Sequence, residues 1–213
     1  MFGRLGVDGA VGQVDGDYLA VVNQNASGSK IDRFLKRSTT YEAEFDPTTS
    51  IVSAIAEVTL ENRAPATGLP DYVIRPHPNA GTDPPPGTNR TYMSLYTPLG
   101  LEELTVNGVP VQASGERELR RNVFSIFYNL PPESVTVVRY RLRGSITPGD
   151  YRLHVRSQVL ASEPEQLSVR IRGASGWRAT ASGQLLQRNG AAVADTPLTK
   201  DFRAALSFSL SRA

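Results

Sequence analysis

Every second residue from Val52 to Leu60 is apolar. A β-strand turns successive side chains to opposite faces, so this alternation predicts a strand from Ile51 to Glu61 that is buried on one face. An extended segment, Phe34 to Phe45, precedes it, and residues 46–50 between the two have the composition of a tight turn. The two segments therefore predict a long antiparallel hairpin.

Short segments rich in β-branched and aromatic residues recur along the chain at intervals of roughly 8–12 residues, separated by turn residues. This spacing predicts an all-β fold, an antiparallel β-sandwich that is either immunoglobulin-like or a larger sandwich of two sheets. Helical periodicity is confined to the extreme N-terminus and to Asp195–Ala205. The further strands are expected at Tyr18–Asn23, Thr91–Tyr96, Leu101–Val106, Val123–Tyr128, Val135–Leu142, Tyr151–Val155, Leu167–Ile171, Trp177–Ala181 and Phe202–Leu210.

The chain is long enough for one such domain, since all-β sandwiches reach about 200–250 residues. We expect residues 15–213 to form the sandwich, with a composition change near 145–150 as the candidate subdomain boundary. Residues 1–14 are Gly-rich and short, and we interpret them as a residual N-terminal segment, the end of a helix.

Residues 63–90 contain seven prolines and several glycines. Proline cannot donate a hydrogen bond to a sheet, so this segment is predicted to be a long loop rather than a central strand. Long loops in compact domains are often functional. We favour a structural role, in which residues near both ends of the loop hold it closed, over ligand binding. The candidate functional residues of the loop are Asp71, Tyr72, His77, Asn89 and Arg90.

The sequence contains none of the common catalytic motifs. It has no cysteine, no Gly-x-Ser-x-Gly elbow and no phosphate-binding loop, and its two histidines, His77 and His154, are isolated. A hydrolase built on either histidine is kept as a remote alternative. We therefore expect no catalytic residues and no cofactor.

The acidic residues do not specify a metal or glycosidase site either. Asp71, His77 and Asp83 share the long loop, but their spacing specifies no metal, so no metal site is predicted. Two carboxylate pairs could imitate a glycosidase centre, which needs a defined separation across a cleft. The pairs are Glu102 with Glu103 and Glu116 with Glu118. For Glu116 with Glu118, a solvated hairpin end is the simpler interpretation.

The most regular polar pattern is basic. In three predicted strands, arginine or histidine alternates with apolar residues, so the basic side chains of each strand share one face. If these strands are neighbours, eight basic side chains form one sheet face that could bind a polyanion through the guanidinium fork. An ordinary solvated face is the alternative interpretation. The residues are Arg139, Arg141, Arg143, Arg152, His154, Arg156, Arg170 and Arg172.

The overall charge limits the partners. A net charge of +2 is too small for a dedicated nucleic-acid binder, so no nucleic acid is expected. No stretch approaches the ~18 apolar residues of a membrane span. The N-terminus also lacks the apolar core of a signal peptide, so this part of the protein is not expected to contact a membrane itself.

Six segments follow one another in a distinctive order over residues 16–101. They read GDYLAVVNQN (16–25), GSKID (28–32), LKRSTTY (35–41), TLENRAP (59–65), GLPDYVI (68–74) and TNRTYMSLYTPLGL (88–101). Through these segments the chain resembles the C-terminal region of a bacterial, mostly actinobacterial, envelope protein family catalogued as domain of unknown function 4012. The resemblance covers residues from about Leu5 to Leu167.

The resemblance implies a membrane-anchored parent protein whose body lies on the extracytoplasmic side of the cell envelope. It implies no catalytic residues. We therefore expect a non-catalytic structural or interaction domain linked to cell-wall or surface-polysaccharide biology, with a polysaccharide or another envelope protein as partner. The alternative is a carbohydrate- or polyanion-binding module that uses the arginine-rich face.

Overall fold

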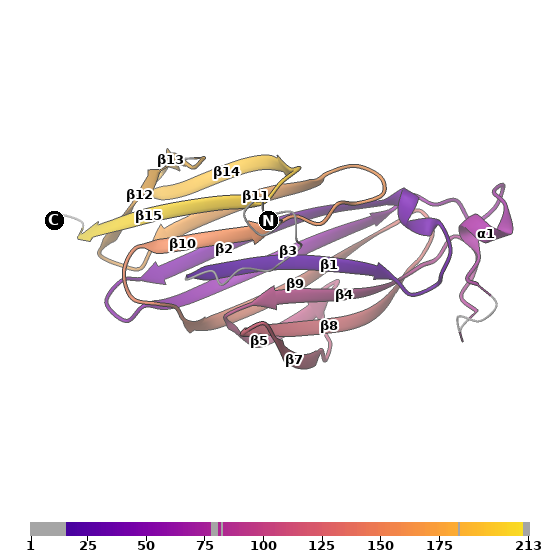
Figure 1. Cartoon of the computed structure of the whole chain (residues 1–213), viewed down its shortest axis with the longest axis horizontal. Coiled ribbons are helices and arrows are strands. Elements are labelled where there is room, and N and C mark those ends of the chain that lie inside the picture. Colours follow the sequence, from indigo (N-terminus) through magenta and orange to yellow (C-terminus); the bar gives the residue numbers. More distant parts are fainter. Residues whose placement is uncertain (1–15, 78–80, 82, 183, 211–213) are drawn as a thin grey trace, which may run out of the picture.

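The computed structural model describes residues 16–77, 81, 83–182 and 184–210. Two β-sheets pack face to face and form an elongated sandwich (Figure 1). One sheet has seven strands, in the order β12 (Trp177–Ser182), β15 (Phe202–Leu210), β10 (Tyr151–Arg156), β1 (Asp17–Asn25), β4 (Asn89–Thr97), β8 (Arg121–Leu130) and β7 (Ser114–Glu118). The other has eight, in the order β13 (Leu186–Arg188), β14 (Ala191–Leu198), β11 (Glu165–Gly173), β2 (Leu35–Asp46), β3 (Ile51–Asn62), β9 (Ser134–Ser145), β5 (Gly100–Val106) and β6 (Val109–Pro110). The predicted all-β sandwich is confirmed, in its larger two-sheet form.

The predicted long hairpin is also confirmed. β2 and β3 pair without interruption from Leu35 opposite Asn62 to Asp46 opposite Ile51. Alternate residues of both strands are buried, as the apolar alternation in the sequence requires. This hairpin forms the centre of the eight-stranded sheet, with β11 on one side and β9 on the other.

Two strand pairings are parallel. β1 pairs in parallel with β10, and β2 pairs in parallel with β11. These partners are separated by more than 100 residues, and the sequence carries no local signal for such a pairing. Strands from before and after residues 145–150 therefore share both sheets.

The helical expectation for Asp195–Ala205 is wrong. This segment contains the end of β14 and the start of β15, and in β15 its buried residues Phe202 and Ala204 alternate with exposed ones. The local helix propensity of its alanines is overridden by pairing with β11 and β10. The predicted N-terminal segment, residues 1–14, lies outside the described residues.

The long loop between β3 and β4 lies at one end of the sandwich, beyond the ends of the strands (Figure 1). It contains a single helical turn, α1 (Asp71–Ile74). A short 3-10 turn, η2 (Ile31–Phe34), precedes β2 at the same end. Ile31, Ala64 and Ile74 pack there as a small hydrophobic cluster, separate from the main core. The predicted loop thus has a core of its own.

Candidate functional site

The outer face of the eight-stranded sheet carries an open groove of about 340 Å³. Its floor lies on β3, where the outward-facing side chains of Ser53 and Ile55 are shorter than those of the flanking glutamates and arginines. Longer side chains flank this floor on the neighbouring strands. They are Glu42 and Glu44 on β2, Arg141 and Arg143 on β9, Arg170 and Arg172 on β11, and Glu102 on β5.

Strand register arranges these residues in two parallel rows. The first row runs Arg170, Glu42, Ile55, Arg141, and the second runs Arg172, Glu44, Ser53, Arg143. Each row therefore has an arginine at both ends, with a glutamate and an uncharged residue, Ile55 or Ser53, between them. The end strands lie three strand spacings apart, about 14 Å at the usual spacing. The four arginines thus form the two walls of the groove.

The arginines differ in how far their charges are compensated. The Nε atom of Arg172 lies 2.9 Å from Oε2 of Glu44. The guanidinium of Arg141 lies 3.4 Å from Glu102 and 3.2 Å from Glu103. Arg143, in contrast, donates from Nη1 to the neutral hydroxyl of Ser53 at 2.8 Å.

Arg170 forms no ion pair with any described residue, although Glu42 lies opposite it in the register. The guanidiniums of Arg143 and Arg170, one on each wall, therefore keep donors for a ligand.

The predicted face of eight basic residues is wrong in its geometry. β10 lies in the seven-stranded sheet, between β1 and β15, so it cannot share a face with β9 or β11. β9 and β11 share a sheet, but β2 and β3 separate them. The alternation correctly predicted which side chains of each strand face outward, but not which strands lie side by side, because pairing here joins distant segments. The three residues displaced to the other sheet are Arg152, His154 and Arg156.

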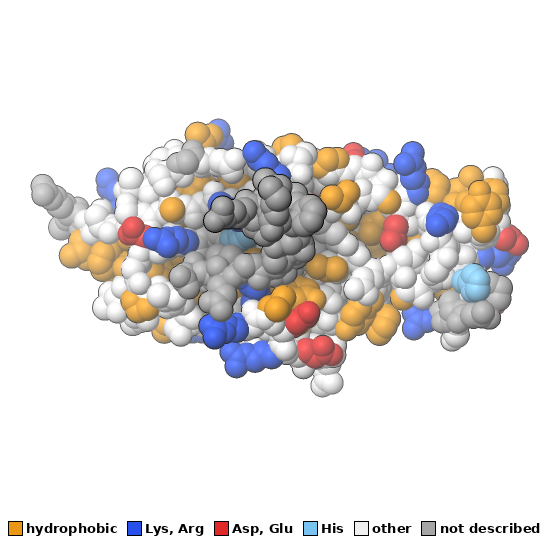
Figure 2. All heavy atoms as spheres, viewed as in Figure 1, with side chains coloured by type: hydrophobic (Ala, Val, Ile, Leu, Met, Phe, Trp, Pro, Cys, Tyr) orange, Lys and Arg blue, Asp and Glu red, His pale blue; other side chains and the backbone are white. Residues whose placement is uncertain are grey.

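The outer face of the seven-stranded sheet carries a mixed surface. In the view of Figure 2, basic, acidic and hydrophobic side chains are interspersed over the part that is not drawn in grey. Arg152 is exposed there, whereas His154 is buried. This face therefore does not provide the continuous basic surface that the sequence suggested.

His154 is held in a structural contact. Its Nε2 atom lies 2.9 Å from Oδ2 of Asp201, and its ring meets Tyr18 edge-on. Burial lowers its pKa below the usual value, against the opposing effect of the Asp201 carboxylate. The nearby hydroxyl of Ser157 donates to the backbone carbonyl of Leu198 at 3.0 Å, not to the histidine. These groups are therefore not arranged as a nucleophile relay, in which the histidine contacts the hydroxyl.

The candidate loop residues are dispersed. Asp71 pairs with Arg75 at 2.9 Å on the exposed helical turn, and Tyr72 is exposed beside it. The backbone N–H of His77 donates to the carbonyl of Ser27 at 2.7 Å. No group of three potential metal ligands occurs within the residues that the structure describes. The described residues of the loop therefore form no assembled ligand site.

The loop is held closed, as expected. Of the predicted loop residues, Asn89 takes part, and Asn62 makes the other contacts. Asn62, fully buried at the end of β3, donates from Nδ2 to the carbonyls of Gly87 (2.8 Å), Leu130 (3.1 Å) and Pro131 (2.8 Å). Asn89 donates to Oδ1 of Asp32 at 3.0 Å. These contacts fasten the end of the loop to η2 and to the β8–β9 turn.

Arg90 extends over the exposed ring of Phe127, with its guanidinium carbon 5.4 Å from the ring centroid. It therefore belongs to the strand surface rather than to the loop.

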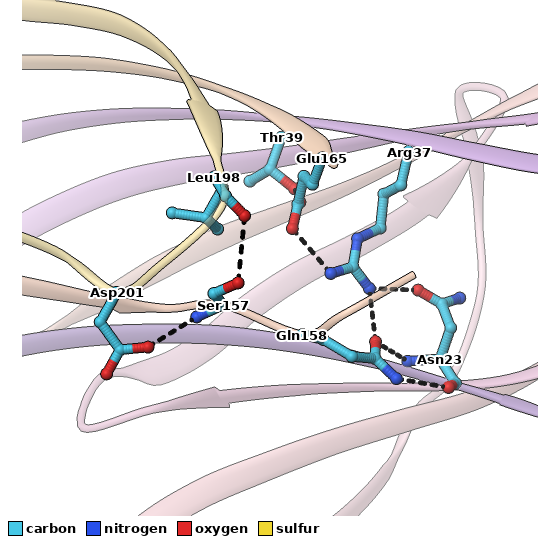
Figure 3. Close-up of polar contacts among 8 residues, drawn as sticks. All are labelled: Asn23, Arg37, Thr39, Ser157, Gln158, Glu165, Leu198 and Asp201. Carbon is cyan, nitrogen blue, oxygen red and sulfur yellow. Dashed lines mark hydrogen bonds and ion pairs between the residues drawn. The ribbon is translucent and has the colours of Figure 1, made fainter. Parts of the chain in front are cut away.

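A buried polar network joins the two sheets, and the sequence prediction missed it. Arg37 on β2 points into the sandwich (Figure 3), where Nη2 lies 2.7 Å from Oε2 of Glu165. Nη1 donates to Oδ1 of Asn23 on β1 at 2.5 Å and to Oε1 of Gln158 at 2.9 Å. Thr39 donates to the other carboxylate oxygen of Glu165. The guanidinium thus links β2 with β11 in its own sheet and with β1 in the other.

A second buried cluster lies at the other end of β1. Asp17 accepts hydrogen bonds from the hydroxyls of Tyr41 and Tyr151, both at 2.5 Å, and from the backbone N–H of Tyr18 at 2.8 Å. Burial raises the pKa of Asp17 to about 6, although the three hydrogen bonds act in the opposite direction. Burial also raises the pKa of both tyrosines. All three side chains lie between the sheets, so the cluster is structural.

No protein-family model and no curated protein matches the sequence. Among solved structures, a protein described as nutrient binding from Legionella pneumophila is similar with a TM-score of 0.48 and 11% identity, over 91% of this chain and 71% of that chain. Yeast LTA4 hydrolase in complex with bestatin has a TM-score of 0.48 and 10% identity, over 99% of this chain and 33% of the hydrolase. An M1 zinc metallopeptidase variant from Deinococcus radiodurans has a TM-score of 0.37 and 13% identity, over 86% of this chain and 45% of the peptidase. These similarities are too low to support a functional inference.

Proposed function

We propose that this chain is a non-catalytic interaction domain that binds an acidic polysaccharide in the groove on the eight-stranded sheet. The observation that carries this proposal is the pair of guanidiniums on opposite walls, Arg143 and Arg170, whose charges no carboxylate within 4 Å compensates among the described residues. A guanidinium binds a carboxylate through two parallel hydrogen bonds, and this geometry also selects the orientation of the ligand.

The mixed composition of the groove favours a saccharide over a simple polyanion. Glu42, Glu44 and Glu102 line it together with the arginines and would repel a densely charged polymer. The same carboxylates can accept hydrogen bonds from sugar hydroxyls. A chain that carries both carboxylates and hydroxyls, such as a uronic acid polymer, complements both kinds of side chain. The side chains of Ser53 and Ile55, which are shorter than those flanking them, leave room for such a polymer.

The cellular setting is part of the same proposal. The ordered segments over residues 16–101 resemble the envelope protein family named above, and this resemblance supports a place on the extracytoplasmic side of the cell envelope in a longer, membrane-anchored protein. A polysaccharide ligand suits that location. No helix in the described residues is long and apolar enough to cross a bilayer.

Affinity electrophoresis in gels that contain polygalacturonate, with neutral dextran as the reference polymer, tests the proposal. Retardation by polygalacturonate alone, at low ionic strength, is the expected result, and salt should weaken it. Replacing both Arg143 and Arg170 with glutamine should weaken binding by about tenfold or more, as expected for the loss of charged hydrogen bonds.

The matched control replaces two exposed arginines of the other sheet, Arg152 and Arg178, with glutamine. It makes the same change in net charge. Equal losses in the two double variants would mean that binding follows net charge and not the groove. No retardation of the unmodified protein at low ionic strength would overturn the proposal.

A further inference from the structure

One edge of the seven-stranded sheet is formed by two strands in turn, by β7 along one part and by β8 along the rest. β7 covers β8 only from Glu118 opposite Arg121 to Ser114 opposite Ser125. Beyond this point no other strand of the described residues pairs with that edge of β8, although β4 pairs with the opposite edge as far as Leu130. The segment Ile126–Leu130 therefore has one strand neighbour where the sheet has room for two.

The open edge presents backbone hydrogen-bonding groups. The side chain of Ser114 donates to the backbone carbonyl of Ser125 at 3.2 Å, so that carbonyl faces β7. Backbone groups of a strand alternate in direction, so the N–H and C=O groups of Phe127 and Asn129 face the same edge. Both residues are exposed. An incoming strand would find a regular set of donors and acceptors there.

A slot of about 350 Å³ runs along this edge. Val106 and Val111, which belong to β5 and to the chain after β6, line the side toward the other sheet. Phe127 and Tyr92 line the outer side, and their rings pack with centroids 4.5 Å apart. Gln112, Ser114 and Ser125 complete the end next to β7. No charged side chain contributes to the lining.

The edge also lacks the usual protection. Natural edge strands carry charged residues, prolines or bulges that prevent further pairing. The segment Ile126–Leu130 has none of these, and its sequence, Ile-Phe-Tyr-Asn-Leu, begins with three residues that favour strands. Phe127 is 61% exposed, an unusual value for an aromatic residue in the middle of a strand.

We infer that this slot binds an extended, uncharged peptide segment of another protein, which adds to the sheet as a strand beside β8. The segment pairs with the edge of β8 beyond Ser125, the last residue of β8 that pairs with β7. Its inward side chains contact Val106 and Val111, and its outward side chains contact Phe127. Because the β5–β6 side bounds the slot, it holds one strand, which favours a peptide over a second folded copy. Strand addition of this kind gains affinity from the main chain and selectivity from alternate side chains.

This inference is independent of the groove on the eight-stranded sheet, because the slot is lined by residues of β4, β5, β7 and β8 and of the β6–β7 connection and shares none with the groove. The probe is a fluorescein-labelled peptide with the sequence acetyl-Ser-Val-Thr-Val-Thr-Val-Ser-amide, measured by fluorescence anisotropy on the whole chain. A second peptide with proline at the central valine removes a main-chain donor. We expect binding of the first peptide and at least about tenfold weaker binding of the second.

Val111→Lys places a charge in the slot and should weaken binding of the first peptide by about tenfold or more. Val159→Lys makes the same change at a site that is 93% exposed and lies outside the slot, and should leave binding unchanged. Hydrogen exchange at the Phe127 and Asn129 amides should slow when the peptide binds. The inference is overturned if the peptide does not bind, or if it binds without protecting these amides. A dimer that Val111→Lys dissociates would also overturn it, in favour of pairing between two copies of the chain.

Discussion

Arg37 on β2 and Glu165 on β11 form an ion pair inside the sandwich, with Nη2 of the arginine 2.7 Å from Oε2 of the glutamate and side-chain exposures of 0% and 2%. The second terminal nitrogen of Arg37 reaches Asn23 in the opposite sheet. A buried charge is costly unless it is paired, so each member of this pair depends on the other. The pair therefore fixes how the two sheets meet at this end of β1.

Glu165→Ala should destabilise the fold by about 3–5 kcal/mol, because it leaves the Arg37 charge buried and without a counter-charge. Urea denaturation followed by circular dichroism measures the change. Replacing both residues, with Arg37→Met and Glu165→Leu, should cost less than the single change, because no charge is then left unpaired. A loss below about 1 kcal/mol for Glu165→Ala would show that the charge is stabilised in another way.

The raised pKa of Asp17 predicts that the stability of the fold depends on pH in the opposite direction to that caused by a salt-bridged carboxylate. Burial raises its pKa from 3.8 to about 6 in the folded protein. Its contribution to stability is therefore full below the unfolded-state pKa and is lost as the pH rises through about 6. The difference in unfolding free energy between the wild type and Asp17→Asn should change by about 3 kcal/mol between pH 3 and pH 7, in favour of the wild type at low pH.

Urea denaturation of both proteins at intervals across this range gives the midpoint of the change directly. Tyr41→Phe is the companion variant, since it removes a hydrogen bond that lowers the pKa of Asp17. It should move the midpoint upward. A flat difference between the wild type and Asp17→Asn would mean that Asp17 titrates alike in the folded and unfolded chains.

The hydrogen bonds of Asn62 hold the end of the long loop in place. Its side chain donates to three carbonyls and its Oδ1 atom accepts the N–H of Ala64 at 3.1 Å. Asn62→Ala removes these hydrogen bonds at a fully buried position and should destabilise the fold by about 1–3 kcal/mol. Limited proteolysis should then cut within residues 63–88 first. Glu57→Gln, on the outer face of the same strand and in no ion pair among the described residues, should change neither the stability nor the cleavage pattern.

The sequence predicted most strands because their side chains alternate, and alternation is local. It could not place β10 beside β1 or β11 beside β2, because those pairings join distant segments. The sequence does contain a signal for the buried network. Arg37 is in phase with Tyr41 and Phe45 on the buried side of its strand, as Glu165 is with Leu167. A charge in phase with buried residues predicts an interior partner.

The floor of the groove offers a test that changes no charge. Ser53→Phe fills the space between the arginine walls with a large side chain and should weaken polygalacturonate binding by about tenfold or more. Thr59→Phe makes a comparable change on the same face of β3, about 20 Å further along the strand, and should leave binding unchanged. Both sites face solvent, so each variant should unfold within about 0.5 kcal/mol of the wild type. If Ser53→Phe binds as well as Thr59→Phe, the polysaccharide does not lie in the groove.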